Sequence, residues 1–222
     1  MSYAIKVKIA IFLIAIVIFS VIFTSWGFDD IEGLLAHPAR VTLLLLLLIL
    51  FIIFGFFIPM GWMLSRLPEY PISESNRLIA FIGAMGILLF LMISPFSDRH
   101  QWMLLGSEDA VRYLGIILFI IGAFFTLWAS FHMCKMLKNQ PNFQLIIDGP
   151  FKYVRHPRDF GVILIFVSIP LVFLSSLGLL LALLSVAGLF ERISREEKLL
   201  ERQFQEEWQT YAENTKCLIP WV

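Results

Sequence analysis

The chain has 222 residues, of which 59% are hydrophobic and 15% are charged, and 22 of them are phenylalanine. This composition, with a mean hydropathy of +0.84, lies outside the range of soluble globular domains and predicts an integral membrane protein. The formal net charge is zero, so the sequence gives no electrostatic support for nucleic-acid binding. Cys134 and Cys217 are too far apart for a metal-binding spacing or a disulfide framework, so we expect packing residues and no metal.

Four apolar runs are long enough, or nearly so, to cross a bilayer, because a helix needs about 20 apolar residues for roughly 30 Å of hydrocarbon. They cover residues 4–26, 41–64, 78–94 and 111–133. The first run is too long for the core of a typical signal peptide and has no clear cleavage site, so we expect it to be retained.

A fifth apolar stretch, residues 160–190, is too long for one upright helix. It contains Pro170, Ser175-Ser176 and Gly178 near its middle. Division at that point gives two arms of about 15 residues, each reaching roughly 22 Å at 1.5 Å per residue. The stretch therefore predicts a short helical hairpin that returns the chain to the side from which it came.

The basic residues indicate how these segments are oriented. If the N-terminus is cytoplasmic and residues 160–190 form a hairpin, 14 of the 17 Lys and Arg residues lie inside, and only Arg40, Arg99 and Arg112 lie outside. This positive-inside bias predicts that the loop before the hairpin and the C-terminal tail share the cytoplasmic face. The predicted fold is an all-α, multi-pass membrane helix bundle, with four full spans, a short C-terminal hairpin and a cytoplasmic amphipathic tail helix.

Polar chemistry is concentrated in the loop before the hairpin, Asp148-Gly-Pro-Phe-Lys-Tyr-Val-Arg-His-Pro-Arg-Asp-Phe-Gly161. Gly149-Pro150 is a turn signal, and Pro157 fits the first turn of a helix while keeping His156 out of the helical region. The free N–H groups and positive dipole of such a helix start can receive a carboxylate or another anion. The alternative is a basic loop that only follows membrane topology.

The tail, residues 191–211, has the periodicity of an amphipathic helix, with Ile193, Leu200, Phe204, Trp208 and Tyr211 on one stripe. Glu197 falls inside that stripe, and Arg192 and Glu196 are neighbours on one face. An acid in an apolar stripe costs free energy unless it meets a partner, for which the basic loop or a cationic ligand is a candidate. A surface salt bridge between Arg192 and Glu196, and a Glu197 side chain that reaches water, are the alternatives.

Two separated motifs resemble the isoprenylcysteine carboxyl methyltransferase family, whose C-terminal design integral-membrane phospholipid methyltransferases share. They are Gly149-Pro-Phe-Lys-Tyr-Val-Arg-His-Pro-x-x-x-Gly161 and Arg192-x-x-x-Glu196-Glu197-x-x-Leu200-x-x-x-Phe204-x-x-x-Trp208-x-x-Tyr211, followed by Leu218-Ile219-Pro220. The resemblance covers residues 143–222. Together with the spans, it predicts an N-terminal transmembrane part, residues 1–134, and a methyltransferase core, residues 135–222.

The resemblance implies an enzyme that uses S-adenosylmethionine in a pocket facing the cytoplasm and methylates a lipophilic acceptor entering from the bilayer. It implies that Arg192 orients the acceptor and is the catalytic residue. The cofactor residues that it implies are Phe143, Gln144, Leu145, Ile146, Phe151, His156, Pro157, Arg158, Asp159 and Glu196.

Carboxyl O-methylation of an isoprenylcysteine-like acceptor is the leading expectation. A carboxylate is already ionised at neutral pH, so this reaction requires alignment of the reacting atoms and exclusion of water rather than a general base. The alternatives are N- or S-methylation of a phospholipid or small molecule, a membrane reductase, and an inactive scaffold. The reductase is disfavoured because the sequence has no phosphate-binding glycine run.

Two positions depart from the pattern of the family. Its members usually carry histidine where this chain has Phe143, and an aromatic residue, mostly tyrosine, where it has Asp159. An acid in the first turn of a helix is stabilised by the helix dipole. An acid close to the carboxylate of the cofactor is also expected to weaken cofactor binding or to change which acceptor is used.

Overall fold

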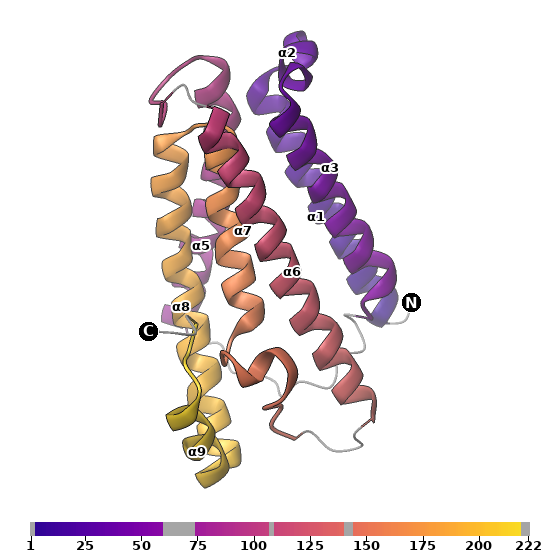
Figure 1. The fold of residues 1–222 in the computed structure, drawn as a ribbon, viewed down its shortest axis with the longest axis vertical. Coiled ribbons are helices and arrows are strands. Elements are labelled where there is room, and N and C mark those ends of the chain that lie inside the picture. Colours follow the sequence, from indigo (N-terminus) through magenta and orange to yellow (C-terminus); the bar gives the residue numbers. More distant parts are fainter. Residues whose placement is uncertain (1–2, 60–73, 107–108, 140–143, 219–222) are drawn as a thin grey trace.

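The computed structural model describes residues 3–59, 74–106, 109–139 and 144–218 (Figure 1). Within these ranges the chain is helical, with two isolated β-bridges and no strand, which confirms the all-α prediction. The elements are α1 (Tyr3–Trp26), η1 (Phe28–Asp30), α2 (Ile31–Ala36), α3 (Pro38–Ile52), the π-helical η2 (Ile53–Phe57), α5 (Glu74–Arg99), α6 (Asp109–Asn139), the 3₁₀ turn η3 (Gly149–Lys152), α7 (Pro157–Val172), α8 (Ser176–Phe204) and α9 (Glu206–Asn214).

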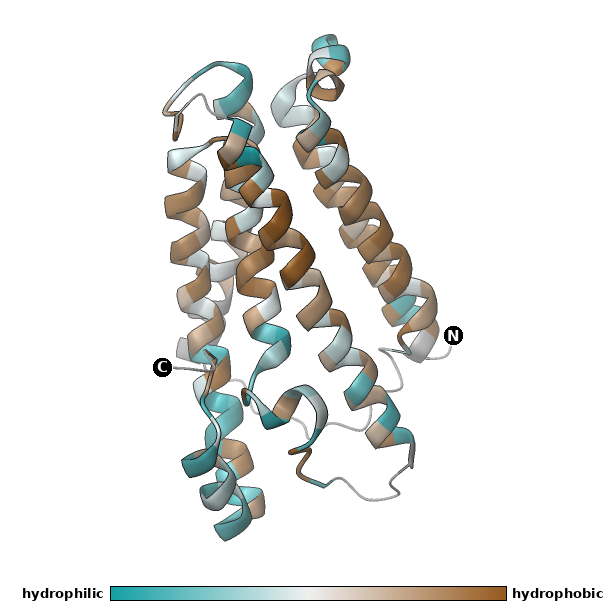
Figure 2. Ribbon diagram, in the orientation of Figure 1, coloured by the Kyte–Doolittle hydropathy of each residue, from teal (hydrophilic) through white to brown (hydrophobic). Residues whose placement is uncertain are grey.

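Five of the described helical segments are long and apolar enough to cross a membrane: Ile5–Trp26, Pro38–Phe57, Phe81–Arg99, Asp109–Lys138 and Ser176–Phe204. The first four correspond to the four predicted spans. Figure 2 shows their hydrophobic middles and the more polar ends of the bundle. The end of the second predicted span, residues 60–64, lies outside the described residues.

The hairpin prediction is confirmed: α7 runs one way, α8 returns, and the turn lies at residues 173–175. Leu174 takes a positive φ of 50°, and the Ser175 hydroxyl caps α8 by accepting from the Gly178 N–H at 2.9 Å. Pro170 lies inside α7 rather than at the turn, and the Ser175 N–H donates to its carbonyl at 2.8 Å. The first arm has 16 residues, close to the predicted length.

The boundaries predicted for the second arm and the tail are wrong. The arm does not end near residue 190, because α8 continues without a break to Phe204 and joins the two predicted helices into one of 29 residues. Residues 190 and 191 mark a change from apolar to polar sequence, which does not break a helix. The break comes at Gln205, whose φ is +45°, and α9 then turns back toward the loop.

Contact between α6 and α7 depends on glycine at two facing positions. A Cβ atom on Gly122 would lie 2.6 Å from the carbonyl oxygen of Gly161, and one on Gly161 would collide with the carbonyl of Gly122. The two helix backbones therefore touch directly, which fixes the start of α7, where the predicted cofactor residues lie, against α6.

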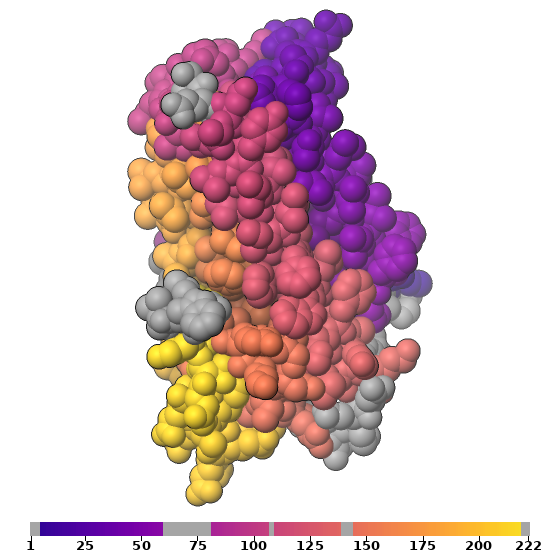
Figure 3. Space-filling view, in the orientation of Figure 1, coloured from indigo at the N-terminus to yellow at the C-terminus, as the bar shows by residue number. Residues whose placement is uncertain are grey.

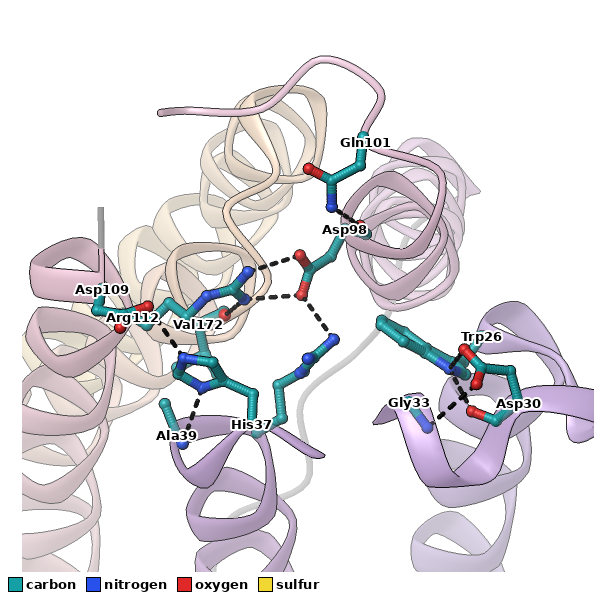
Figure 4. A network of polar contacts seen from close by, with 11 residues as sticks. Trp26, Asp30, Gly33, His37, Ala39, Asp98, Gln101, Asp109, Arg112 and Val172 are labelled. Carbon is teal, nitrogen blue, oxygen red and sulfur yellow. Dashed lines mark hydrogen bonds and ion pairs between the residues drawn. The ribbon is translucent and has the colours of Figure 1, made fainter. Parts of the chain in front are cut away.

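The end of the bundle farther from α9 is held by a buried ion network, shown in Figure 4. Asp98 on α5 accepts from both terminal nitrogens of Arg112 on α6 at 2.7 Å, and from Arg40 on α3 at 3.4 Å. Arg112 also donates to the carbonyl of Val172 at 2.6 Å. Asp98 is 1% exposed, so these contacts supply the charge compensation that a buried carboxylate requires.

Candidate active site

The loop after α6 is positioned by the last turns of that helix. Gly149 takes a φ of +60°, and a Cβ atom there would lie 2.5 Å from the ring of His132. The same ring lies 2.9 Å from a carboxylate oxygen of Asp148. Glycine at this position therefore allows the Gly-Pro turn to pass close to α6, and the turn leads into η3 and the start of α7.

The C-terminal tail pairs with this loop through its backbone. The N–H of Arg155 donates to the carbonyl of Lys216 at 2.8 Å, and the N–H of His156 donates to that of Cys217 at 3.0 Å. The guanidinium of Arg155 donates to the carbonyls of Ala212, at 2.9 Å, and Thr215. Figure 3 shows the tail, in yellow, against the loop, in orange.

Glu197 on α8 is the acid that joins the loop to the tail helix. Its Oε1 accepts from Nε of Arg155 at 2.8 Å and lies 3.2 Å from Nε2 of His156. The basic loop, one of the two partners that the sequence offered for this acid, therefore contacts it. Arg155 also lies over the ring of Trp208, 5.7 Å from its centroid. The positive φ at Gln205 brings α9 back to make this contact.

Tyr211 on α9 closes the same region. Its hydroxyl donates to the carbonyl of Phe151 at 2.6 Å. Burial is the main cause that raises the pKa of the Tyr211 phenol, so it stays a neutral donor at physiological pH.

A cavity lies between the loop, the end of α6, α8 and α9. Its volume is about 60 Å³, far below the roughly 300–1,000 Å³ of typical small-molecule pockets. Six of the predicted cofactor residues line it, namely Gln144, Leu145, Ile146, Phe151, His156 and Glu196. The structure therefore brings two distant motifs to one cavity, which must widen to admit a nucleotide-sized ligand.

The other predicted site residues lie beside the cavity rather than in its lining. Pro157 is buried in the first turn of α7, and the carbonyl of Arg158 faces the hydroxyl of Thr126 at 3.5 Å. Asp159 is buried and accepts from Nη2 of Arg192. Arg192, predicted to orient an acceptor, therefore already holds a carboxylate from its own chain. Phe143 lies outside the described residues.

The comparisons with known proteins bear on the same segment. Residues 111–207 match the phospholipid methyltransferase family. This family comprises integral-membrane methyltransferases related to the isoprenylcysteine carboxyl methyltransferases. The match therefore confirms the predicted resemblance over residues 143–207, which both cover, and the apolar helices indicate an integral membrane protein. A search of curated proteins gave no match.

The matched segment, residues 111–207, runs from the start of α6 into α9 and contains the loop, the hairpin and every predicted site residue. Five further residues line the cavity without having been predicted to bind the cofactor: Met133, Arg155, Leu200, Trp208 and Tyr211. Leu200, Trp208 and Tyr211 were assigned to the apolar stripe of the tail, whose periodicity gives no sign that a cavity lies beneath it. Met133 carries no sequence signal of a site.

Among the described residues, two groups of possible metal ligands share His156. One comprises His156, Glu197 and Cys217, and the other His156, Asp159 and Glu196, with ligand atoms within 4.8 Å of one another. Arg155 already neutralises Glu197, and Arg192 already neutralises Asp159. Burial, followed by the negative charge of Glu197, raises the pKa of the Cys217 thiol to about 11, which keeps it protonated. These contacts favour an organic ligand over a metal ion.

Proposed function

We propose that this protein transfers a methyl group from S-adenosylmethionine to a lipophilic acceptor at the loop end of the bundle. The observation that carries the proposal is the cavity in which six predicted cofactor residues meet, five from residues 144–156 and one from α8. The family match supports methyl transfer. The positive-inside count supports a cytoplasmic position for this end of the molecule.

The chemistry of the lining fits S-adenosylmethionine, which carries a sulfonium, an ammonium, a carboxylate and an adenine ring. When bound, it supplies a methyl group whose carbon–sulfur bond is activated by the positive charge on sulfur. Glu196 is suited to the ammonium or a ribose hydroxyl, and the rings of Phe151 and Tyr211 are suited to adenine or the sulfonium. The N-terminus of α7 at His156 is suited to the carboxylate.

The first candidate acceptor is the carboxylate of an isoprenylcysteine. Arg192 supports it, because a guanidinium binds a carboxylate through two parallel hydrogen bonds, and this side chain is 44% exposed. The prenyl chain of such an acceptor is apolar, which suits entry from the bilayer. In this reaction the chain has to align the acceptor and exclude water, and no proton has to be removed.

The second candidate is an amine-bearing phospholipid, and a specific observation favours it. Arg192 already pairs with the buried Asp159, so an incoming carboxylate has to compete with an internal one. The matched family is also that of phospholipid methyltransferases. A zwitterionic head group offers a cation to Asp159 and a phosphate to Arg192.

The test uses the full chain in lipid nanodiscs. Calorimetry with S-adenosylhomocysteine measures cofactor-site binding, and tritiated methyl incorporation from S-adenosylmethionine measures turnover with prenylcysteine or with phosphatidylethanolamine. Glu196→Gln is expected to weaken binding by about tenfold, through loss of a charged contact. The matched control Glu191→Gln, which removes an acid on the same helix that pairs with Arg195, is expected to bind normally. A wild-type protein that binds neither S-adenosylhomocysteine nor S-adenosylmethionine would exclude the proposal.

The same measurements address the other functions that the sequence left open. A reductase is expected to bind a nicotinamide dinucleotide instead of S-adenosylhomocysteine. A scaffold is expected to keep its cellular role when Arg192 and Glu196 are both replaced.

A further inference from the structure

The ion pair between Asp159 and Arg192 connects the two arms of the hairpin at the edge of the candidate active site. Asp159 lies in the first turn of α7 and is 3% exposed, whereas the Arg192 side chain on α8 is 44% exposed. The arginine therefore has room to turn toward an incoming ligand, and the carboxylate has none. His156 lies 3.8 Å from the other oxygen of Asp159.

The charges around Asp159 oppose a second carboxylate. Glu196 and His156 lie with it in one group whose polar atoms are within 4.8 Å of one another. If a carboxylate acceptor bound Arg192, Asp159 would lose the cation that it pairs with. It would then lie buried beside two other anions, the Glu196 carboxylate and the carboxylate of the acceptor. Such a state carries both the desolvation cost of a buried charge and like-charge repulsion.

We propose that Asp159 is a specificity-determining residue that selects amine-bearing phospholipids over carboxylate acceptors. This inference rests on the proposed methyltransferase function and names its acceptor class. The head-group ammonium takes the place of Arg192 as the cation beside the Asp159 carboxylate, and Arg192 turns to the head-group phosphate. The zwitterionic head group thus exchanges partners with the internal ion pair and leaves neither side chain without an opposite charge.

An amine acceptor also needs a proton acceptor, which a carboxylate acceptor does not. A primary alkylammonium has a pKa of about 10, so at neutral pH its nitrogen has no free lone pair. The proton passes from that nitrogen to the Asp159 carboxylate and then to water. The freed lone pair forms a bond to the methyl carbon, and the electron pair of the broken carbon–sulfur bond stays on sulfur. The products are a methylated ammonium, a neutral thioether and one released proton.

A purely structural role for Asp159, as the partner that fastens α7 to α8, predicts a different outcome. Loss of this contact between the helices would lower the rate of methylation by the same factor with every acceptor. If Asp159 instead selects the acceptor by charge and by proton transfer, its loss lowers the rate of methylation of amine acceptors alone. The ratio of the two activities therefore separates the roles, and total activity does not.

The experiment compares wild type, Asp159→Asn and Asp159→Glu in the full chain in nanodiscs, with Glu191→Gln as the matched control. Asp159→Asn is expected to lower methylation of phosphatidylethanolamine by about 100-fold, typical of a lost proton acceptor, and to leave methylation of a prenylcysteine equal or higher. Asp159→Glu is expected to keep the preference for the amine. Native mass spectrometry adds a readout independent of turnover: Asp159→Asn is expected to lose selective binding of phosphatidylethanolamine over phosphatidylglycerol.

Equal loss with both acceptors in Asp159→Asn, or no change with the amine, would overturn the inference. If that variant does not fold, a wild-type protein that methylates prenylcysteine at least as fast as phosphatidylethanolamine would overturn it. Binding of S-adenosylhomocysteine is recorded for each protein. Its absence in the wild type refutes the proposed function, whereas normal binding with no change in acceptor ratio refutes the role of Asp159 alone.

Discussion

Arg155 and Glu197 lie 42 positions apart in the chain, and their side chains meet at 2.8 Å. The first belongs to the loop before α7 and the second to α8, so this contact exists because the hairpin returns the chain to the loop. The same arginine binds two carbonyls of the tail. One side chain of the loop therefore connects that loop to α8 and to the tail, which are three of the four segments around the cavity.

Replacing Glu197 with glutamine is expected to loosen this connection. The substitution leaves a partly buried arginine without its counter-charge, and we expect a loss of about 1–3 kcal/mol in the free energy of unfolding. Limited proteolysis and thermal melting in nanodiscs measure it, and the exposed Glu213→Gln on α9 is the control. If the tail becomes no more accessible to protease in Glu197→Gln than in the control, the contact does not hold the tail.

Gly161 and Gly122 set the distance between α6 and α7. Gly161→Ala places a methyl group against the carbonyl of Gly122, and we expect a loss of about 1–3 kcal/mol from overpacking. Gly83→Ala is the matched control, since the nearest atom to a Cβ atom there is 3.8 Å away. Because α7 begins at the candidate active site, Gly161→Ala is also expected to weaken S-adenosylhomocysteine binding. Equal melting temperatures for the two variants would contradict the direct backbone contact.

Asp98 is the shared carboxylate of the buried network at the other end of the bundle. Asp98→Asn leaves the buried Arg112 and the partly buried Arg40 without their shared counter-charge, for which we expect a loss of about 3–5 kcal/mol. The protein that remains folded is expected to bind S-adenosylhomocysteine normally, because the network lies away from the cavity. Asp109→Asn, in an exposed contact with His37, serves as the control and is expected to change stability little.

Sequence reasoning succeeded where one physical requirement dominated. Span length and the distribution of basic residues predicted the hairpin, and the cost of an acid in an apolar stripe predicted that Glu197 would meet a partner. It failed at Gln205, because glutamine gives no signal for a left-handed backbone conformation. It also assigned Asp159 and Arg192 to separate ligands, because the pairing of these two residues, 33 positions apart, depends on how α7 and α8 pack together. The pattern and spacing of residues along the sequence do not show which side chains of two helices meet in space.

The thiol of Cys217 offers a test of how closely the tail covers the loop. Burial, then the negative charge of Glu197, raises the pKa of this thiol to about 11. At pH 8 only about one thiol in a thousand is then ionised, so a Cys134→Ser variant is expected to react slowly with iodoacetamide and faster as the pH rises toward 11. The protonated thiol contributes stability below its unfolded pKa of about 8.5, and this contribution is lost as the pH rises through the folded value. Rapid alkylation at pH 8, at the rate of a free cysteine, would show that the tail does not lie against His156. In Glu197→Gln, faster alkylation is expected for two reasons, because loss of the negative charge lowers the pKa of the thiol and because the loosened tail exposes it.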